Sequence, residues 1–238
     1  MNRDDRARIV VLAGGYGGAK LSHGVALASA AREAAGGASL DLTVIVNTGD
    51  DLELHGLDVS PDLDTVMYTL AGLANDDTGW GVREETWSTG AMLERYGAET
   101  WFGLGDRDMA THIRRTQLRR DGMTLTETTA ELCARLDVPA RLLPMTDDEV
   151  RTDIRTPAGW LEFQDYFVRR GQTDEVLEIR RRGIEEARPT PQVLEAIDGA
   201  DLIVIAPSNP FVSVGTILAL SGMPAAVTEA KAAVVAVS

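Results

Sequence analysis

The order of apolar and polar residues divides the chain into two similar ends and a different middle. Near the N-terminus the runs Ile9 to Ala13 and Leu42 to Val46 are short and continuously apolar, which is typical of strands buried on both faces of a parallel sheet. Between them an alanine-rich stretch, 19–35, predicts a helix that ends at the glycine pair 36–37. The first fifty residues therefore predict a strand, a helix and a second strand.

The same alternation returns at the end of the chain. Asp201 to Ala206 and Ala233 to Val237 have the pattern of buried strands, and Val212 to Leu220 has that of a helix. We therefore expect one parallel sheet in which the Ile9 and Ile203 strands pair.

The middle of the chain follows another pattern. Apolar spacing predicts helices over about 62–137, and Pro157-Ala158-Gly159 joins two strand-like runs, 150–156 and 160–167, into a hairpin. The fold class is thus α/β, a three-layer Rossmann-like parallel sheet with an inserted α+β subdomain. Its predicted domains are a discontinuous nucleotide- or phosphate-binding core, 1–74 and 188–238, and an inserted helical-plus-hairpin subdomain, 75–187.

The chain stops at Val237-Ser238, directly after a predicted strand. Parallel sheets usually cover such a strand with a further helix, so we expect that a C-terminal part is missing. An exposed strand edge at this place would favour association into a homodimer.

Composition limits the class of protein. Of 238 residues 44% are hydrophobic and 25% are charged, as in ordinary soluble globular proteins, and no run approaches the ~18 apolar residues of a membrane span. The polar N-terminus is no secretory signal, so a cytoplasmic location without membrane contact is expected. The single cysteine, Cys133, lies in a helical pattern and is expected to be a buried thiol.

The formal net charge is −14, from 23 basic and 37 acidic side chains. Such a field repels polyanions and excludes nucleic acid as a partner. A phosphate-containing ligand would need a local device, such as a metal ion, an amide cradle or a few placed basic residues.

A glycine-rich segment follows the first strand. It contains Gly14, Gly15, Gly17 and Gly18, with Lys20 close behind. Glycines let the backbone approach a ligand, and a helix N-terminus offers free N–H groups to a phosphate. The spacing fits neither the dinucleotide fingerprint nor a Walker loop. The alternative is a tight turn that simply needs glycine.

Carboxylates cluster after the second strand. Asp50 and Asp51 stand where open α/β sheets bind ligands, as candidate metal or hydroxyl ligands or as a solvated turn. Asp62 and Asp64 follow Ser60-Pro61, a helix start, and their spacing suits Mg²⁺ beside phosphates, although capping alone could explain one of them.

Two further loops carry polar side chains. In the first, Asp106 is a candidate cap or ligand, Arg107 a partner for an acid, and His112 stands four residues after Asp108 on a predicted helix. In the second, Ser208 and Asn209 follow a buried strand and offer hydrogen bonds to a base or phosphate. Ser213 and Gly215 lie at the next helix start. The alternative for this segment is a proline-punctuated loop.

The ordered set of motifs resembles one family, the 2-phospho-L-lactate transferases of deazaflavin coenzyme biosynthesis. The resemblance extends over the whole chain, through Gly14 to Gly18, Pro61-Asp62-Leu63-Asp64-Thr65, Leu104-Gly105-Asp106-Arg107-Asp108 with Thr111-His112, Phe163-Gln164-Asp165, Pro207-Ser208-Asn209-Pro210 and Val234 to Ser238. It implies transfer of a phospholactyl or phosphoenolpyruvyl group from a GMP-linked diphosphate donor to the ribityl hydroxyl of the deazariboflavin Fo. GMP leaves. Family chains continue beyond the last strand seen here.

The resemblance also implies residue roles, with Mg²⁺ as the cofactor. The donor would be bound by Gly14, Gly15, Gly17, Gly18, Lys20, Ser208, Asn209, Ser213 and Gly215. The metal would be held by Asp50, Asp51 and Asp62. The acceptor would be bound by Asp64, Gly103, Asp106, Arg107 and His112, and the catalytic residues would be Asp64 and Asp51.

Three rival classes share parts of this pattern. Gluconeogenesis factors, non-enzymatic regulators that bind nucleotide sugars, share the glycine loop and an Asp-Asp turn but differ at Pro61-Asp62-Leu63-Asp64-Thr65. Nucleotidyltransferases place an arginine soon after the glycines, where Ala19 and Lys20 stand here. A nicotinamide dehydrogenase requires another glycine spacing.

Overall fold

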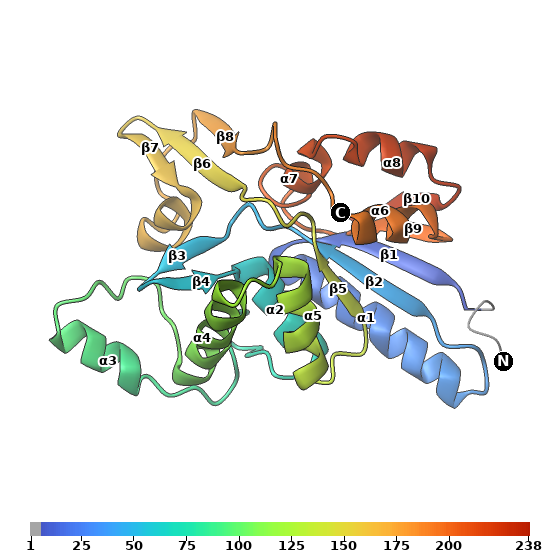
Figure 1. Ribbon diagram of the computed structural model, residues 1–238, viewed down its shortest axis with the longest axis horizontal. Helices are drawn as coiled ribbons and strands as arrows, with labels where there is room; N and C mark the ends of the chain where they lie inside the picture. The colour runs from blue at the N-terminus through green and yellow to red at the C-terminus, as the bar shows by residue number, and fades with distance from the viewer. Residues whose placement is uncertain (1–5) are drawn as a thin grey trace.

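A five-stranded parallel sheet forms the centre of the protein (Figure 1). The computed structural model describes residues 6–238. The strand order is β10-β9-β1-β2-β5. The bounds are β1 (Arg8–Ala13), β2 (Asp41–Val46), β5 (Arg141–Pro144), β9 (Leu202–Ile205) and β10 (Ala233–Ala236). Ile9 aligns with Leu202 and Val10 with Ile203, so the predicted pairing of the two ends of the chain is confirmed.

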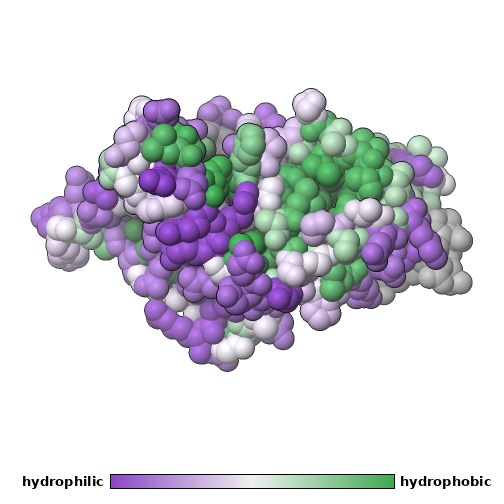
Figure 2. All heavy atoms as spheres, turned by 90° about the horizontal axis from the view of Figure 1, so that it is seen from above, coloured by the Kyte–Doolittle hydropathy of each residue, from purple (hydrophilic) through white to green (hydrophobic). Residues whose placement is uncertain are grey.

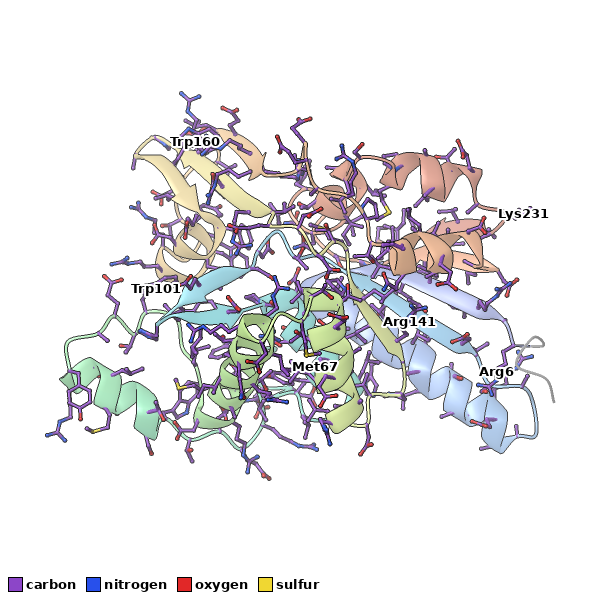
Figure 3. The ribbon with its side chains drawn as sticks, in the orientation of Figure 1. Arg6, Met67, Trp101, Arg141, Trp160 and Lys231 are labelled. Atoms are coloured by element: carbon purple, nitrogen blue, oxygen red, sulfur yellow. The ribbon has the colours of Figure 1, made fainter. Side chains whose placement is uncertain are left out.

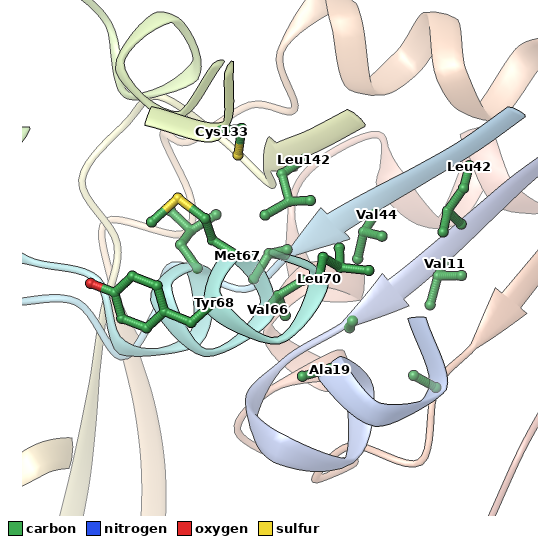
Figure 4. Packing of buried hydrophobic residues seen from close by; sticks show 14 of the residues in the cluster. Val11, Ala19, Leu42, Val44, Val66, Met67, Tyr68, Leu70, Cys133 and Leu142 are labelled. Atoms are coloured by element: carbon green, nitrogen blue, oxygen red, sulfur yellow. The ribbon is translucent and has the colours of Figure 1, made fainter. Parts of the chain in front are cut away.

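Helices cover both faces of this sheet. On one face lie α1 (Gly15–Ala34), α2 (Pro61–Leu70) and α5 (Leu125–Arg135), and on the other α6 (Pro191–Asp198), α7 (Val214–Ala219) and α8 (Met223–Glu229). Successive strand residues point to opposite faces, so Val11 packs with the α2 side and Val10 with the α6 side. Figure 4 shows Val66, Met67 and Leu70 of α2 packed over β2. The three-layer Rossmann-like class is therefore confirmed.

Cys133 belongs to the α2 side of this core. Its thiol is buried, as expected, and burial raises its pKa to about 12. No helix within residues 6–238 is both long and apolar enough to cross a membrane.

The first helix begins earlier than predicted. The expected turn over Gly14–Gly18 is wrong in extent, because α1 starts at Gly15 and already includes Gly17 and Gly18. The helix ends where expected, with Gly36 in the left-handed region at φ +81°.

The remaining elements form a smaller unit beside the sheet. They comprise β3 (Leu52–Leu54) paired with β4 (Leu57–Val59), α3 (Ser88–Arg95), α4 (Asp106–Arg120), and an antiparallel sheet of β6 (Arg151–Thr156), β7 (Gly159–Glu162) and β8 (Glu178–Arg182), with a π-helix over Asp165–Arg169. Seen from above, polar side chains gather over the small sheet, and apolar ones over the opposite half of the molecule (Figure 2).

The small sheet corrects the predicted hairpin. Its second strand ends at Glu162, and a helical turn replaces the expected strand over 163–167. A third strand, β8, was not expected because its sequence is charged. Arg180 and Arg182 pair with the buried carboxylate of Asp153, at 2.7 and 2.8 Å. Arg180 also stacks on Trp160, which Figure 3 labels on this sheet.

The predicted domain division also needs amending. Strand β5 pairs with β2 in the central sheet, and α5 contributes Leu132 and Cys133 to its core. Residues 125–144 therefore belong to the core, although they fall inside the predicted insert 75–187. A parallel strand requires a crossover helix, and α5 supplies it.

Candidate active site

A large cavity opens where β1, β2 and β9 end. Its volume is about 790 Å³. The walls come from the turn before α1, the first turns of α2, the loops 76–81 and 207–213, and the π-helix of the small unit. Ligands of open α/β sheets bind at this edge, so the cavity is the candidate site.

The glycine turn allows three loops to meet at this edge. A Cβ on Gly14 would lie 2.6 Å from Oδ2 of Asp62, and one on Gly17 would overlap the carbonyl oxygen of Pro207. Ser208 ties the turn in place, since its hydroxyl accepts from Gly14 N (3.1 Å) and donates to Gly14 O (2.7 Å). Close backbone approach thus explains these glycines before any ligand is considered.

The predicted donor residues separate into two groups. Those that line the cavity are Gly14, Gly15, Gly17, Ser208, Asn209 and Ser213. Gly18, Lys20 and Gly215 do not. Lys20 is exposed and stacks over the Tyr16 ring at 4.2 Å, and a Cβ on Gly215 would overlap the carbonyl oxygen of Pro210.

Two buried carboxylates face the glycine turn. Asp62 accepts a hydrogen bond from Asn47 Nδ2 at 2.9 Å, whereas Oδ1 of Asp50 has no partner among the described residues. Burial raises the pKa of Asp62 to about 6, although the Asn47 amide and the Gly15 N–H oppose the shift. Burial, together with Asp62, raises the pKa of Asp50 well above its ordinary value. No cationic side chain of the described residues offsets the burial of either carboxyl.

Mg²⁺ fits this pair. The ion prefers carboxylate oxygens and usually keeps several waters or phosphate oxygens as its other ligands. Asp50 and Asp62 could supply two such oxygens at the cavity wall, one of them unpartnered. Within residues 6–238 no group of three His, Cys, Asp or Glu side chains is arranged to hold a metal alone, so water and substrate would complete the shell.

Asp51 is placed differently from its neighbour. Its side chain does not line the large cavity but a small adjoining one, near Arg151. It accepts from the Ser60 hydroxyl at 2.8 Å, and burial raises its pKa to about 7. This carboxyl bridges the loop after β2 to the start of α2.

Asp64 is held from behind by an arginine. Both of its oxygens accept from the guanidinium of Arg115, Oδ2 at 3.1 Å from Nη1 and Oδ1 from Nη2. Asp64 is 5% exposed and Arg115 is 2% exposed. Burial alone would lower the pKa of Arg115, but the carboxylate of Asp64 outweighs it and raises that pKa.

A second buried chain of polar groups adjoins this pair. Nδ1 of His112 lies 3.1 Å from Nη1 of Arg115, and its Nε2 lies 3.2 Å from Oδ1 of Asp108. Among the described residues, Nε2 has no partner that meets the geometry of a hydrogen bond. Oδ1 of Asp108 also accepts from the Tyr68 hydroxyl at 2.8 Å. Tyr68, Asp108 and His112 all line the cavity.

The other predicted acceptor residues have mixed positions. Gly103 lines the cavity between Trp80 and Trp87, whose rings would lie 3.4 and 3.6 Å from an added Cβ. Asp106 and Arg107 lie outside it, Asp106 half-buried and Arg107 exposed.

Asp106 stabilises the start of α3. It accepts from the Thr86 hydroxyl (2.6 Å) and the N–H groups of Ser88 and Thr89, which lowers its pKa to about 2. Glu85 does the same for α4, because it accepts from the N–H groups at its start. Asp106 of α4 thus caps α3, and Glu85, in the segment before α3, caps α4.

The cavity wall is acidic and aromatic. Its charged residues are six aspartates, Asp50, Asp62, Asp64, Asp76, Asp77 and Asp108. No lysine or arginine of the described chain lines it. Its aromatic residues are Tyr16, Tyr68, Trp80, Phe102, Phe163 and Phe167. Aromatic faces suit a planar ring, while the acids require a cation beside any phosphate.

Some site residues escaped the sequence-based predictions. Arg115 was missed because Arg114 next to it carries the same charge, and only the spacing Asp108, His112, Arg115 along one helix face distinguishes them. Tyr68 was missed because its position in α2 continues an apolar pattern. Asn47 was missed because nothing in the local sequence shows that it reaches Asp62.

The fold and the cavity define a Rossmann-like α/β protein with a glycine-bordered acidic cleft at the carboxyl edge of its sheet. The family model for 2-phospho-L-lactate transferase CofD matches residues 9–238. This chain belongs to that family of transferases.

Named relatives agree with this assignment. The chain is 50% identical to phosphoenolpyruvate transferase of Streptomyces griseus subsp. griseus, in a match that covers 97% of this chain and 72% of that protein. It is 48% identical to the phosphoenolpyruvate transferase of Kitasatospora aureofaciens, over 97% and 71%. The corresponding protein of Mycobacterium avium is 43% identical, over 97% and 74%.

Solved structures support the fold. A Bacillus halodurans protein described as a member of the UPF0052 family superposes with a TM-score of 0.66 at 18% identity. The superposition covers 98% of this chain and 68% of that one. At this identity the likeness concerns the fold alone.

Proposed function

We propose that this protein transfers a phosphoenolpyruvyl or phospholactyl group from a GMP-linked diphosphate donor to the ribityl hydroxyl of Fo. The observation that carries the proposal is the placement of Asp62 and Asp64 on one buried helix turn, with Asp62 beside the glycine turn and Asp64 beside the aromatic wall. Family membership and the names of the relatives agree with it.

The donor would lie along the glycine turn. Its nucleotide would meet Ser208, Asn209 and Ser213, which line that side of the cavity. Asp50 and Asp62 would hold Mg²⁺, which when bound would neutralise phosphate charge in this acidic cleft. Gly18, Lys20 and Gly215 support the turn from outside in this proposal.

The acceptor would lie on the opposite side, with its ring among Trp80, Phe102 and Phe163. Asp64 would accept a hydrogen bond from the attacking hydroxyl and orient its oxygen. That oxygen forms a bond to the phosphorus that carries the acid, and the bond from this phosphorus to the oxygen of GMP breaks. GMP leaves with the bonding electron pair, and the hydroxyl proton passes to solvent. Such transfers depend mainly on positioning and charge neutralisation.

The test is GMP release from the donor in the presence of Fo and Mg²⁺, with wild type and Asp64→Asn compared. Asparagine keeps the shape of Asp64 and one acceptor oxygen for Arg115 but removes the negative charge. Because breaking a buried ion pair is costly, the fold of the variant is checked by circular dichroism. We expect Asp64→Asn to lose at least tenfold in turnover and Asp121→Asn, an exposed change at the end of α4, to lose nothing.

Two results would contradict the proposal. One is equal turnover in Asp64→Asn and wild type. The other is binding of uridine diphosphate sugars without any GMP release from the donor, which would favour the regulatory function of the gluconeogenesis factors.

A further inference from the structure

One face of α4 meets one face of α2 beneath the acceptor side of the cavity. Asp108, His112 and Arg115 follow the spacing i, i+4, i+7, and Asp64 and Tyr68 follow i, i+4. All five side chains are buried, with at most 6% of each residue exposed. Four of them line the cavity, and Arg115 alone lies behind them.

The guanidinium of Arg115 forms three short contacts. Two go to the oxygens of Asp64, and the third, from Nη1, goes to Nδ1 of His112 at 3.1 Å. The carbonyl oxygen of Asp58 is more distant, at 3.4 Å. Arginine carries five N–H donors and no acceptor, so every contact requires a lone pair on its partner. A hydrogen bond from Nη1 to Nδ1 of His112 therefore requires an unprotonated Nδ1.

This requirement determines the tautomer of His112. A ring nitrogen that accepts from Arg115 leaves the imidazole proton on Nε2, which faces Oδ1 of Asp108 at 3.2 Å. Asp108 is itself held by the Tyr68 hydroxyl. The opposite ring orientation would place carbon atoms against both Arg115 and Asp108, so the two contacts agree on one orientation.

We propose that Arg115 is a positioning residue, which fixes the orientation of Asp64 and the Nε2–H tautomer of His112 through one guanidinium. The inference rests on the proposed function, in which Asp64 orients the attacking hydroxyl of the acceptor. It assigns His112 the role of a hydrogen-bond donor through Nε2. Nδ1 is occupied by Arg115 and so is no acceptor for a proton from the attacking hydroxyl.

The first test needs neither substrate nor activity. The chain has three histidines, His23, His55 and His112, so ¹⁵N correlation spectra of the imidazoles are simple to assign with His112→Gln as reference. At neutral pH we expect His112 to give the pattern of a pure Nε2–H tautomer. A protonated Nδ1, in either the other tautomer or the imidazolium, would overturn the proposal.

The second test uses Arg115→Lys, which keeps the charge but loses the two-point fork. We expect kcat for GMP release to fall by about ten- to a hundredfold, because small misplacements of reacting groups have effects of this order. KM for the donor should stay unchanged, and the His112 spectrum should become mixed. Arg114→Lys is the matched control, since Arg114 is exposed and, among the described residues, its side chain bonds only to Gln117.

The outcomes separate this inference from the proposed function. Wild-type turnover and an unaltered tautomer in Arg115→Lys would overturn the inference alone. A wild-type protein without transferase activity would contradict the proposed function, while its imidazole spectrum still decides the tautomer. If Arg115→Lys does not fold, the wild-type spectrum remains the deciding measurement.

Discussion

At the scale of single residues, the site is built by close approach. Gly14, Gly17 and Gly18 let the start of α1 and the residue before it touch neighbouring segments such as α2 and the loop 207–213. A side chain at any of them would meet atoms within 3 Å. The sequence indicated that glycine was needed here. It could not indicate whether the nearest atoms belong to a phosphate or to the protein itself.

Gly17→Ala tests whether the start of α1 needs glycine for close approach to the loop 207–213. The new Cβ overlaps the carbonyl oxygen of Pro207, which as backbone cannot turn aside, so we expect a loss of stability of about 1–3 kcal/mol. Guanosine nucleotide binding should weaken at least tenfold.

Gly24→Ala in the same helix is the control, because its Cβ meets nothing within 4 Å. It should instead stabilise the protein by about 0.5–1 kcal/mol. Urea unfolding measures the stability of both variants, and nucleotide titration measures their affinity. If Gly17→Ala and Gly24→Ala were equally stable and bound the nucleotide equally well, the steric argument would be wrong.

At the scale of elements, the strength of the local signal decided what could be predicted. The strands of the central sheet were predictable because they are apolar on both faces, and α2 because Pro61 starts it. Strand β8 was not, since its arginines find Asp153 only in the folded sheet. The cap that Glu85 gives α4 was also hidden, because it joins residues more than twenty positions apart.

The small sheet has a weaker core than the central one. Its buried apolar cluster consists of Ile154, Phe163 and Val212 within the described residues, while two large clusters cover the faces of the central sheet. All four tryptophans, Trp80, Trp87, Trp101 and Trp160, lie in the smaller unit or its connections. Tryptophan fluorescence therefore reports on the smaller unit, whereas far-UV circular dichroism reports on the secondary structure of the whole protein.

We expect the two signals to separate during urea unfolding, with fluorescence changing first. Ile203→Ala removes a buried side chain from β9 and should destabilise the central sheet by about 2–5 kcal/mol. It should shift the circular dichroism midpoint and hardly move the fluorescence one. Val234→Ala, whose residue aligns with Ile203 on β10 but is 45% exposed, is the control. A single midpoint for both signals would show one cooperative unit and contradict this expectation.

At the scale of the whole molecule, acidity dominates. The formal net charge of −14 was predictable from the sequence. Three of the acids lie near one sheet edge, Asp50 and Asp62 buried and Asp51 half-buried. Burial raises the pKa of each above that of an unfolded chain, near 3.9. The folded state therefore binds more protons than the unfolded one at mildly acidic pH.

The sign of the pH dependence follows. Stability falls with pH wherever the folded state holds more protons. The contribution of these groups is full below about pH 4 and is lost as pH rises through 6 and 7, where Asp62 and Asp51 ionise. We expect the free energy of unfolding to drop between pH 5 and 8 by an amount on the order of a few kcal/mol. Urea midpoints at several pH values measure this.

Asp51→Asn is the comparison for that series. It removes one of the raised groups, so its stability should vary less with pH than that of the wild type. A wild-type stability that rises from pH 5 to 8 would contradict the conclusion that burial disfavours the ionised form of these carboxyls and raises their pKa.

The absence of lysine and arginine from the described cavity wall has a physiological consequence under the proposed function. A free nucleotide meets like charge there, whereas the same nucleotide complexed to magnesium arrives with much of its charge cancelled. The enzyme would then draw on the pool of metal-complexed donor and not on total donor. Its flux would follow the supply of free magnesium, so that cells starved of this ion would slow coenzyme production before their nucleotides ran short.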